Sequence, residues 1–406
     1  MSASQPSSGE SVSFFRHLFG VLREPLNWLL AAVPVAAWLH HSHAADLYVF
    51  LASAVAIIPL AGLMGRATEN LSETMGAGIG GLMNATFGNA AELIIAMAAL
   101  RKGPEMYPLV HASLTGSIIG NILLVLGLSL FAGGLKYKTL KFNPTAAGMG
   151  STLLALSVIG MLVPTLFYYG IVFDKHVAET DRTSVGLIST EIAVVLFVTY
   201  ILSLIFSLIT HQHIFAGPEE DLPTSGDHHA PEWNRTASMG VLLVATGFVA
   251  WMSEILVASV EPACDDLGMS RAFVGVIVVA IIGNAAEHST AVLMALKNKI
   301  DLSVNIAVGS SLQIALFVTP VLVFASMFMN PGEPLDLHFR PMEIMALILA
   351  IGVLALVCHD GESHWLEGIM LLAVYIILGV AFFHLPQETT PAGAEPNQTG
   401  ETATAQ

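Results

Sequence analysis

Long runs of hydrophobic residues, separated by short polar segments, extend over most of the chain. Many of these runs have the roughly 20 residues that a helix needs to cross a hydrocarbon core of about 30 Å. They lack the alternation of apolar and polar positions that marks the strands of a membrane barrel. Because a span in lipid must satisfy its own backbone hydrogen bonds, the pattern predicts an all-α integral membrane protein.

Eleven transmembrane helices are expected from this pattern, with boundaries set to within several residues. They cover residues 26–42, 46–65, 76–100, 106–132, 144–169, 184–210, 237–260, 271–296, 302–329, 340–358 and 364–384. The Ser-rich residues 1–13 have a composition typical of disorder, and residues 14–23 predict a short interfacial helix. No cleavable signal is evident, so the first span is expected to act as the insertion signal.

The composition agrees with a membrane protein, since 54% of the residues are hydrophobic and 11% are charged, with a mean hydropathy of +0.72. Soluble domains carry about 25% charged residues. The formal net charge of −16 argues against nucleic acid as a partner, because phosphate recognition needs a basic surface. Cys264 and Cys358 are too few for a disulfide framework, and we expect both to be buried and inert.

One pentapeptide, Gly-Asn-Ala-Ala-Glu, occurs twice inside hydrophobic runs, at residues 88–92 and again 195 positions later at residues 283–287. At helical spacing the Gly and the Asn share a face with the Glu, so each copy offers a carboxylate, an amide oxygen and a gap without a side chain. A carboxylate in a hydrophobic span costs roughly 2.5 to 3.5 kcal/mol and usually marks an ion or proton pathway. One site built from both copies is therefore expected. Its predicted ligands are Glu92, Glu287, Asn89 and Asn284.

The match between the two copies extends downstream. A Gly-Ser pair begins 24 positions after Glu92 and 22 positions after Glu287, again within hydrophobic runs. The structural alternative is a coincidence in a chain rich in Ala and Gly, with each Glu serving as a buried partner for an Arg. The extended match favours a functional pair.

The two copies lie in the third and eighth expected spans, so the repeat shift is five spans. An odd shift inverts the second copy in the membrane, which is the plan of many secondary transporters and places the substrate site near the midplane. We expect one extra N-terminal helix followed by two inverted five-helix repeats. The expected segments are 1–45 with the first span, 46–210 as the first repeat, 211–236 as an acidic and His-rich loop, 237–384 as the second repeat, and 385–406 as a disordered tail.

Orientation and two other segments are read from the polar residues. Nine Lys and Arg residues fall on the side of the N-terminus and six on the other, a mild bias that predicts the N-terminus inside. The loop at residues 211–236 either collects divalent cations or, as its irregular spacing favours, is a solvated linker. The Gly-rich residues 76–81 allow either local unwinding or close helix packing.

The expected ligands favour a hard cation. Carboxylate and amide oxygens without thiolates suit Ca²⁺, which takes about six to eight oxygens. Polar side chains near the two motifs either complete the shell or, for the hydroxyls, bond backbone carbonyls. These are Asn84, Ser117, Ser310, Ser311 and Gln313.

Two carboxylates can each hold a proton or can together hold a divalent cation, so cation and protons should compete for the site. Coupled to alternating access between inverted halves, this competition makes an antiporter. His288, directly after Glu287, either assists the proton step or packs as a hydrogen-bonded core residue. No cofactor is expected, because Ca²⁺ and H⁺ are the transported substrates.

Residues 88–93 and 283–288, with Gly-Ser-Ser-Leu-Gln-Ile at residues 309–314, resemble the two repeat signatures of the cation/proton exchanger (CAX) family of Ca²⁺/H⁺ antiporters. The resemblance extends over nearly all of residues 46–384 and includes the acidic loop. It implies an eleven-helix protein of the calcium/cation antiporter superfamily.

The resemblance also implies roles for individual residues. Glu92 and Glu287 would be the essential ion-binding carboxylates. The residues lining the site would be Asn89, Asn284, Ser117 and Gln313, and the secondary acidic residues near the pathway would be Glu69, Glu254 or Glu261. One departure is Gly120, where many relatives have Ser at the position that pairs with Gln313.

Three other functions fit the sequence less well than Ca²⁺/H⁺ exchange. Sodium/calcium exchangers of the same superfamily resemble one another in Thr/Ser-x-Pro-Glu repeats, and here Ala stands in place of that Pro. A membrane-embedded metal-dependent hydrolase would need a His-x-x-x-His pair or a nucleophile elbow, and neither motif contains one. A channel would not move cations uphill. The protein is expected in the lipid bilayer of a bacterial inner membrane. The sequence allows either a monomer or a homo-oligomer.

Overall fold

The computed structural model describes residues 25–75, 77–173, 182–215 and 233–386. Helices make up nearly all of this part of the chain. The elements are η1 Pro25–Ala31, α2 Ala32–His41, α3 Asp46–Met75, α4 Ala77–Phe87, α5 Ala90–Lys102, η2 Pro104–Met106, α6 Tyr107–Ile119, η3 Gly120–Val125, α7 Leu126–Lys136, β1 Leu140–Lys141, α8 Pro144–Phe173, α9 Arg182–Ile205, η5 Phe206–Thr210, α10 Gln212–Phe215, α11 Arg235–Leu267, α12 Arg271–Phe273, η7 Val274–Val279, α13 Ala280–Gly283, α14 Ala285–Leu296, α15 Ile300–Gln313, η8 Ile314–Val318, α16 Thr319–Met329, α17 Pro341–Val357, β2 Glu362–Ser363 and α18 Trp365–Phe383.

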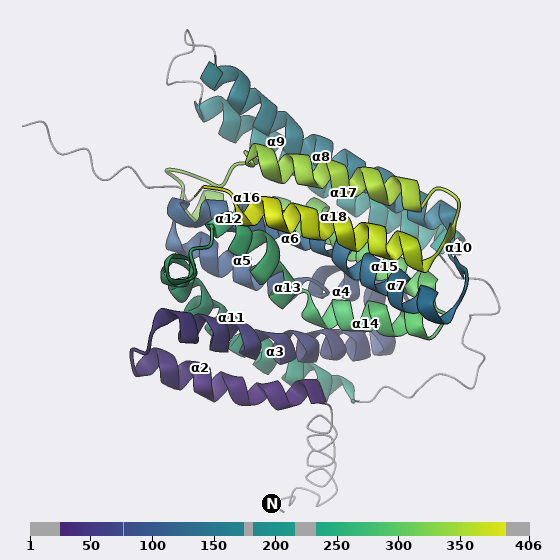
Figure 1. Cartoon of the computed structure of the whole chain (residues 1–406), viewed down its shortest axis with the longest axis horizontal. Helices are drawn as coiled ribbons and strands as arrows, with labels where there is room; N and C mark the ends of the chain where they lie inside the picture. Colours follow the sequence, from purple (N-terminus) through teal and green to yellow (C-terminus); the bar gives the residue numbers. More distant parts are fainter. Residues whose placement is uncertain (1–24, 76, 174–181, 216–232, 387–406) are drawn as a thin grey trace, which may run out of the picture.

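The longer helices lie side by side with their axes along the long dimension of the molecule (Figure 1). The helices α2, α3 and α11 form one edge of the bundle, and α8 and α9 form the opposite edge. Between them lie the short helices α4, α5, α13 and α14, which α6, α7 and α15 surround. The strands β1 and β2 pair antiparallel in the loops that follow α7 and α17.

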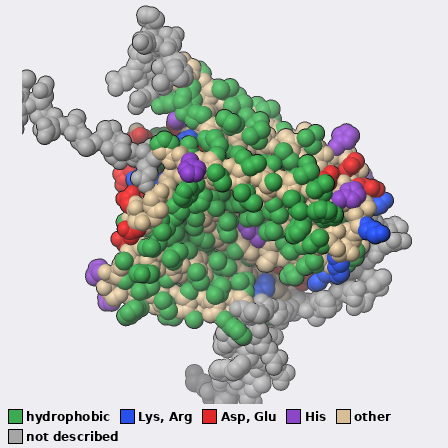
Figure 2. Space-filling view, in the orientation of Figure 1, with side chains coloured by type: hydrophobic (Ala, Val, Ile, Leu, Met, Phe, Trp, Pro, Cys, Tyr) green, Lys and Arg blue, Asp and Glu red, His purple; other side chains and the backbone are tan. Residues whose placement is uncertain are grey.

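Hydrophobic side chains cover the middle of the face seen in Figure 2, and the charged side chains on this face gather at the two ends of the bundle. At one end, Lys136 donates to the carbonyl oxygen of Leu296 at 2.8 Å, and Arg235 donates to that of Thr74. We call this the basic end. At the other end Arg101 and Arg271 pair with Glu254 and Glu261. Because large side chains such as Leu356 (77% exposed) would be costly in water, this surface is suited to lipid.

Among the described residues, seven helices are long and apolar enough to cross a membrane, and one bent pair makes a possible eighth span. The difference from the eleven expected spans has three sources. The helix α2 has ten residues, α17 has seventeen, and the third expected span is divided into α4 and α5. The expected features of residues 1–23, most of the loop at 211–236, and the tail after residue 386 lie outside the described residues.

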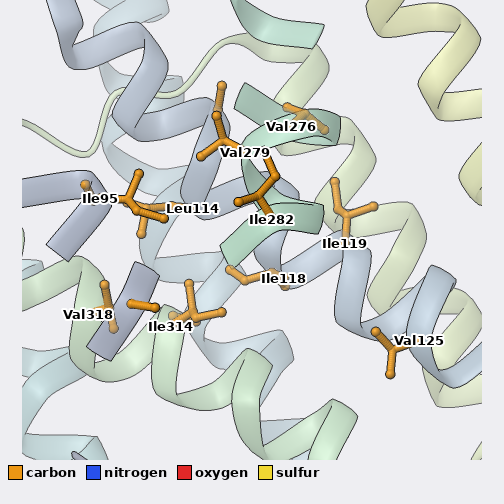
Figure 3. Packing of buried hydrophobic residues seen from close by; sticks show 14 of the residues in the cluster. Ile95, Leu114, Ile118, Ile119, Val125, Val276, Val279, Ile282, Ile314 and Val318 are labelled. Carbon is orange, nitrogen blue, oxygen red and sulfur yellow. The ribbon is translucent and has the colours of Figure 1, made fainter. Parts of the chain in front are cut away.

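Aliphatic side chains from elements far apart in the sequence meet around the broken helices (Figure 3). The labelled residues are Ile95 on α5, Leu114, Ile118 and Ile119 on α6, Val125 on η3, Val276 and Val279 on η7, Ile282 on α13, and Ile314 and Val318 on η8. Gly116 makes one of these contacts possible, because a Cβ there would lie 2.2 Å from the carbonyl oxygen of Val276. The Gly of this Gly-Ser pair therefore serves close packing of α6 on η7.

Candidate functional site

The first copy of the pentapeptide lies at the break between α4 and α5. Gly88 N donates to the carbonyl oxygen of Asn84 at 2.9 Å, and Asn89 leaves helical geometry with φ −101° and ψ 30°. Glu92 therefore falls in the first turn of α5. The unpaired N–H groups at a helix N-terminus carry a partial positive charge, so the break places this carboxylate beside groups that attract negative charge.

The second copy lies at the break between α13 and α14, where the chain bends by 62°. Asn284 has φ −96° and ψ 7°, and Glu287 falls in the first turn of α14. The helix α5 runs from its break to the end where Arg101 pairs with Glu254, whereas α14 runs to the basic end (Figure 1). The two carboxylates thus stand at the N-termini of half-helices that start mid-bundle and run in opposite directions.

A cavity of about 520 Å³ contains both carboxylates. Glu92, which is 6% exposed, and Glu287 line it together with Gly88 and Gly283. A Cβ on Gly283 would lie 3.2 Å from both Cγ and Oε1 of Glu92. The missing side chain of the second copy therefore leaves room for the carboxylate of the first.

The cavity extends toward the basic end of the bundle. Glu69 and Glu73, one turn apart near the C-terminal end of α3, line it, and so does Asn84. All three side chains are exposed. A cation that enters at the basic end therefore meets acidic side chains before it reaches Glu92 and Glu287.

Asn89 binds residues of α15, in the other half of the chain. Its Nδ2 donates to Gln313 Oε1 at 2.7 Å, and its Oδ1 accepts from Ser310 Oγ, also at 2.7 Å. Ser310 Oγ is also hydrogen-bonded to Glu287 Oε2. One chain of contacts thus joins Glu287 on α14, Ser310 on α15, Asn89 at the start of α5 and Gln313 on α15, and we call it the Asn89 half-site.

Asn284 binds residues of the first half in the same crossed manner. Its Nδ2 donates to Ser117 Oγ at 3.0 Å and to the carbonyl oxygen of Ala280 at 2.9 Å, while its Oδ1 accepts from Asn121 Nδ2 at 3.2 Å. Asn284, Ser117 and Asn121 are each at most 2% exposed. We call this set the Asn284 half-site.

Asn121 is the member that sequence reasoning missed. It lies in the π-helical turn η3, and its Oδ1 is buried without a hydrogen-bond partner among the described residues. The available signal was an amide inside a hydrophobic run directly after Gly120, the position that departs from the related sequences.

The remaining predicted residues lie elsewhere. Glu254 and Glu261 are not among the cavity-lining residues and form ion pairs of 2.9 and 2.8 Å with Arg101 and Arg271. His288 follows Glu287 on α14, and its Nε2 is buried without a hydrogen-bond partner in the described part of the chain. Ser311 bonds backbone carbonyl oxygens, with Ala307 at 2.8 Å.

Residues 77–81 of the Gly-rich segment are helical, and Gly80 packs closely against α3. The helix α4 continues through Gly80 and Gly81, and a Cβ on Gly80 would lie 2.2 Å from the carbonyl oxygen of Ser72 on α3. The break in the third expected span comes later, at Gly88 and Asn89. The unwound backbone is therefore the pentapeptide itself.

Among the described residues there is no group of three or more His, Cys, Asp or Glu side chains that could hold a metal ion. Two carboxylates surrounded by amides and hydroxyls instead suit a hard cation that is bound and released, because neutral oxygens and water complete the shell of such ions.

Comparison with known proteins places the chain among ion exchangers. The family model described as sodium/calcium exchanger protein matches residues 46–209 and 237–384. The chain is 45% identical over 372 residues to a Ca²⁺/H⁺ antiporter of Synechocystis, covering 88% of this chain and 96% of the relative. It is 43% identical over 356 residues to the Ca²⁺/H⁺ antiporter ChaA of Bacillus subtilis, covering 87% and 97%.

Two solved structures have the same fold. The structure of native YfkE superposes with a TM-score of 0.74 at 40% identity, covering 89% of this chain and 100% of that one. The crystal structure of the H⁺/Ca²⁺ exchanger CAX superposes with a TM-score of 0.63 over 91% and 93% of the chains, and at 14% identity this shows the fold alone.

Proposed function

Because the chain belongs to the sodium/calcium exchanger protein family, we propose that it exchanges Ca²⁺ for H⁺ across a membrane. It is a secondary transporter and not an enzyme. Its relatives at 45% and 43% identity are named Ca²⁺/H⁺ antiporters and are matched over nearly their whole length. The observation that carries the mechanism is the meeting of Glu92 and Glu287 in one cavity.

Charge arithmetic gives the exchange cycle. Two ionised carboxylates neutralise one divalent cation, and two protonated carboxylates are neutral without it. Either form can therefore reorient without moving a bare charge through a medium of low dielectric constant. A carrier with one carboxylate ionised and no cation would carry net charge and would reorient slowly.

Ser310 can couple the proton to the cation. A hydroxyl has one proton to donate, and Ser310 Oγ is hydrogen-bonded to both Asn89 Oδ1 and Glu287 Oε2. When Glu287 is protonated, it donates to Ser310, and Ser310 donates to Asn89. When Glu287 is ionised, the Ser310 proton turns to the carboxylate, and Asn89 Oδ1 becomes free to bind a cation.

The same proposal includes the arrangement in the membrane. The two inverted five-helix repeats at residues 46–210 and 237–384, with an extra N-terminal span and eleven spans in all, are supported by the opposite directions of α5 and α14 and by the two blocks of the family match. The excess of Lys and Arg at the basic end supports its placement on the cytoplasmic side. The similarity to a Bacillus subtilis antiporter supports a bacterial inner membrane.

The test is Ca²⁺ uptake into proteoliposomes that contain the purified protein. An outward H⁺ gradient should drive Ca²⁺ above its equilibrium level, and a protonophore should abolish that accumulation. Uphill uptake driven by an outward Na⁺ gradient at constant pH would instead identify a sodium/calcium exchanger. Ca²⁺ movement only down its own gradient would identify a channel and overturn the proposal.

A further inference from the structure

A second cavity, of about 960 Å³, lies on the other side of α15 from the cation site. Residues 144–153 of α8, residues 199–208 of α9 and η5, and one face of α15 form its walls. Asn305, Gly309 and Gln313 line both this cavity and the cation cavity. A single helix therefore separates the two spaces, and we call the second one the α8–α9 crevice.

The crevice exists because α8 and α9 separate toward the basic end. They touch at Gly160, where a Cβ would lie 2.9 Å from Leu196, and α8 touches α15 at Gly150, where a Cβ would lie 2.4 Å from Val308. At Gly148 a Cβ would meet no atom within 4 Å. The helices thus close the crevice at mid-depth and leave it open toward the end of α8.

The chemistry of the lining and of its surroundings points to hydrocarbon. The lining is mostly Ala, Gly, Leu, Met and Phe, and the neighbouring outward faces of α8 and α9 carry large exposed hydrophobic side chains. Leu202, at the edge of the crevice, is 59% exposed. Apolar surface costs about 25 cal/mol per Å² when it is exposed to water. Because these helices are suited to the hydrocarbon layer, an acyl chain of a lipid can cover the apolar lining of the crevice.

We propose that the α8–α9 crevice seats an acyl chain of a phospholipid from the leaflet at the basic end. The chain lies along α8 and α9, and its terminal part contacts α15 beside Gln313. Gln313 accepts from Asn89 Nδ2 at 2.7 Å, so the lipid contacts the wall of the Asn89 half-site. The occupied crevice supports α15 on the side opposite the cation cavity.

The experiment is photolabelling in nanodiscs with phosphatidylcholine that carries a diazirine near the end of one acyl chain, followed by mass spectrometry of the labelled peptides. Leu312 on α15 is the diagnostic residue, because it lines the crevice and is half-buried, unlike the exposed residues of the outer surface. Label at Leu312 is expected in the unmodified protein. Ile376 and Ile377 on α18, which are 63% and 66% exposed, report ordinary lipid contact.

Two matched variants on α8 complete the test. Gly148→Phe fills the crevice with a protein side chain and should remove label from Leu312, while label at Ile376 and Ile377 persists. Gly170→Phe is the control, since Gly170 is exposed on the same helix, has free space for a Cβ and does not line the crevice. It should leave every label in place.

Two results would overturn the proposal. These are absence of label at Leu312 in a protein that is labelled on α18, and label at Leu312 that survives Gly148→Phe. The readout is independent of transport, so an outcome against Ca²⁺/H⁺ exchange would leave it unaffected.

Discussion

The two half-sites contain the same pentapeptide but hold their asparagines differently. Asn284 has its Oδ1 engaged by Asn121 and its Nδ2 shared by two acceptors, so its amide is fixed by groups that do not titrate. Asn89 Oδ1 depends on Ser310, whose hydroxyl is shared with the carboxylate of Glu287. Only the Asn89 half-site is therefore expected to change its hydrogen bonds when Glu287 loses a proton.

The difference arises on the helices that follow the motifs. Gln313 lies three positions after Ser310 and accepts from Asn89, whereas the matching position after Ser117 is Gly120, which has no side chain. Asn121, one position later, supplies a donor to the other asparagine instead. Two copies of one motif thus have different hydrogen-bond partners, and we expect only the Asn89 half-site to respond to protons.

The largest effect is expected at Glu92 and Glu287, because each copy of the pentapeptide contributes one of these carboxylates. Glu92→Gln or Glu287→Gln should abolish pH-driven Ca²⁺ uptake, because one carboxylate leaves the bound cation charged and removes an exchangeable proton. Glu→Asp at either position should keep at most a small fraction, since the shorter side chain misplaces the oxygens. Uptake into proteoliposomes measures both. Glu343→Gln, at a fully buried glutamate that caps α17, is the control and should transport normally; robust uptake by the Glu92→Gln, Glu287→Gln double variant would refute the mechanism.

Ser310→Ala should show the difference between the two half-sites most clearly in the KM for Ca²⁺ and in its dependence on pH. A hydrogen bond to a charged group contributes about 1.5 to 3 kcal/mol, so its loss should raise the KM for Ca²⁺ roughly tenfold or more. It should also flatten the dependence of that KM on pH. Ser117→Ala should have a smaller effect and leave the pH dependence intact. Ser311→Ala, on the adjacent residue that bonds only backbone carbonyls, serves as the control; equal pH dependence in Ser310→Ala and the unmodified protein would contradict the proton relay.

Asn121→Leu tests the fixed half. It removes the donor to Asn284 Oδ1, and a neutral hydrogen bond contributes about 1 kcal/mol, which corresponds to roughly fivefold in the KM for Ca²⁺. The maximal rate and the pH dependence should stay close to their original values, because no titrating group is involved in this contact. Asn70→Leu is the control, since Asn70 also bonds across the chain, to Trp233 N, but away from both half-sites. A change in pH dependence would show that the Asn284 half-site also responds to protons.

His288→Ala tests a titratable group that follows only one of the two glutamates, since Leu93 stands in the matching position of the first copy. If the imidazole assists proton transfer, the pH profile of uptake should shift while Ca²⁺ binding at high pH is retained. Equilibrium binding and uptake measured from pH 5.5 to about 8.5 distinguish these quantities. An unchanged profile would assign His288 to packing.

The smallest effect is expected outside both halves. Deletion of residues 219–227, which lie outside the described part of the chain, should change the affinity or regulation of uptake without stopping exchange. The reason is that the loop joins the two repeats and is not part of either. Loss of transport in a folded deletion variant would show that the acidic loop participates directly.

Much of the candidate site could be predicted from the sequence, because ionisable side chains that are costly to bury are easy to recognise inside hydrophobic runs. A carboxylate in a hydrophobic run costs enough to stand out, and the paired motifs placed Glu92 with Glu287 and Asn89 with Asn284 before any coordinates. Their presence in or beside one cavity agrees with that expectation, and their roles in transport stay predictions. Asn121 was missed because a neutral amide costs less to bury, and its partner is 163 residues away.

Tertiary contacts determine the positions of the helix breaks. The Gly-rich residues 76–81 allowed either unwinding or close packing. In the structure residues 77–81 belong to α4, and Gly80 packs closely against α3. The break instead comes where Asn89 gains hydrogen bonds to α15. The cost of leaving the helix is offset by contacts that only the folded chain provides.

Hydrophobicity and buried charge are properties of single positions, so the sequence by itself indicated that this protein spans a membrane and which two buried carboxylates stand out in its spans. Which asparagine contacts Ser310, where each described span breaks, and the crevice behind α15 depend on the distance between residues far apart in the chain. Hydrogen bonds and packing act over a few ångströms, so only the tertiary structure decided them.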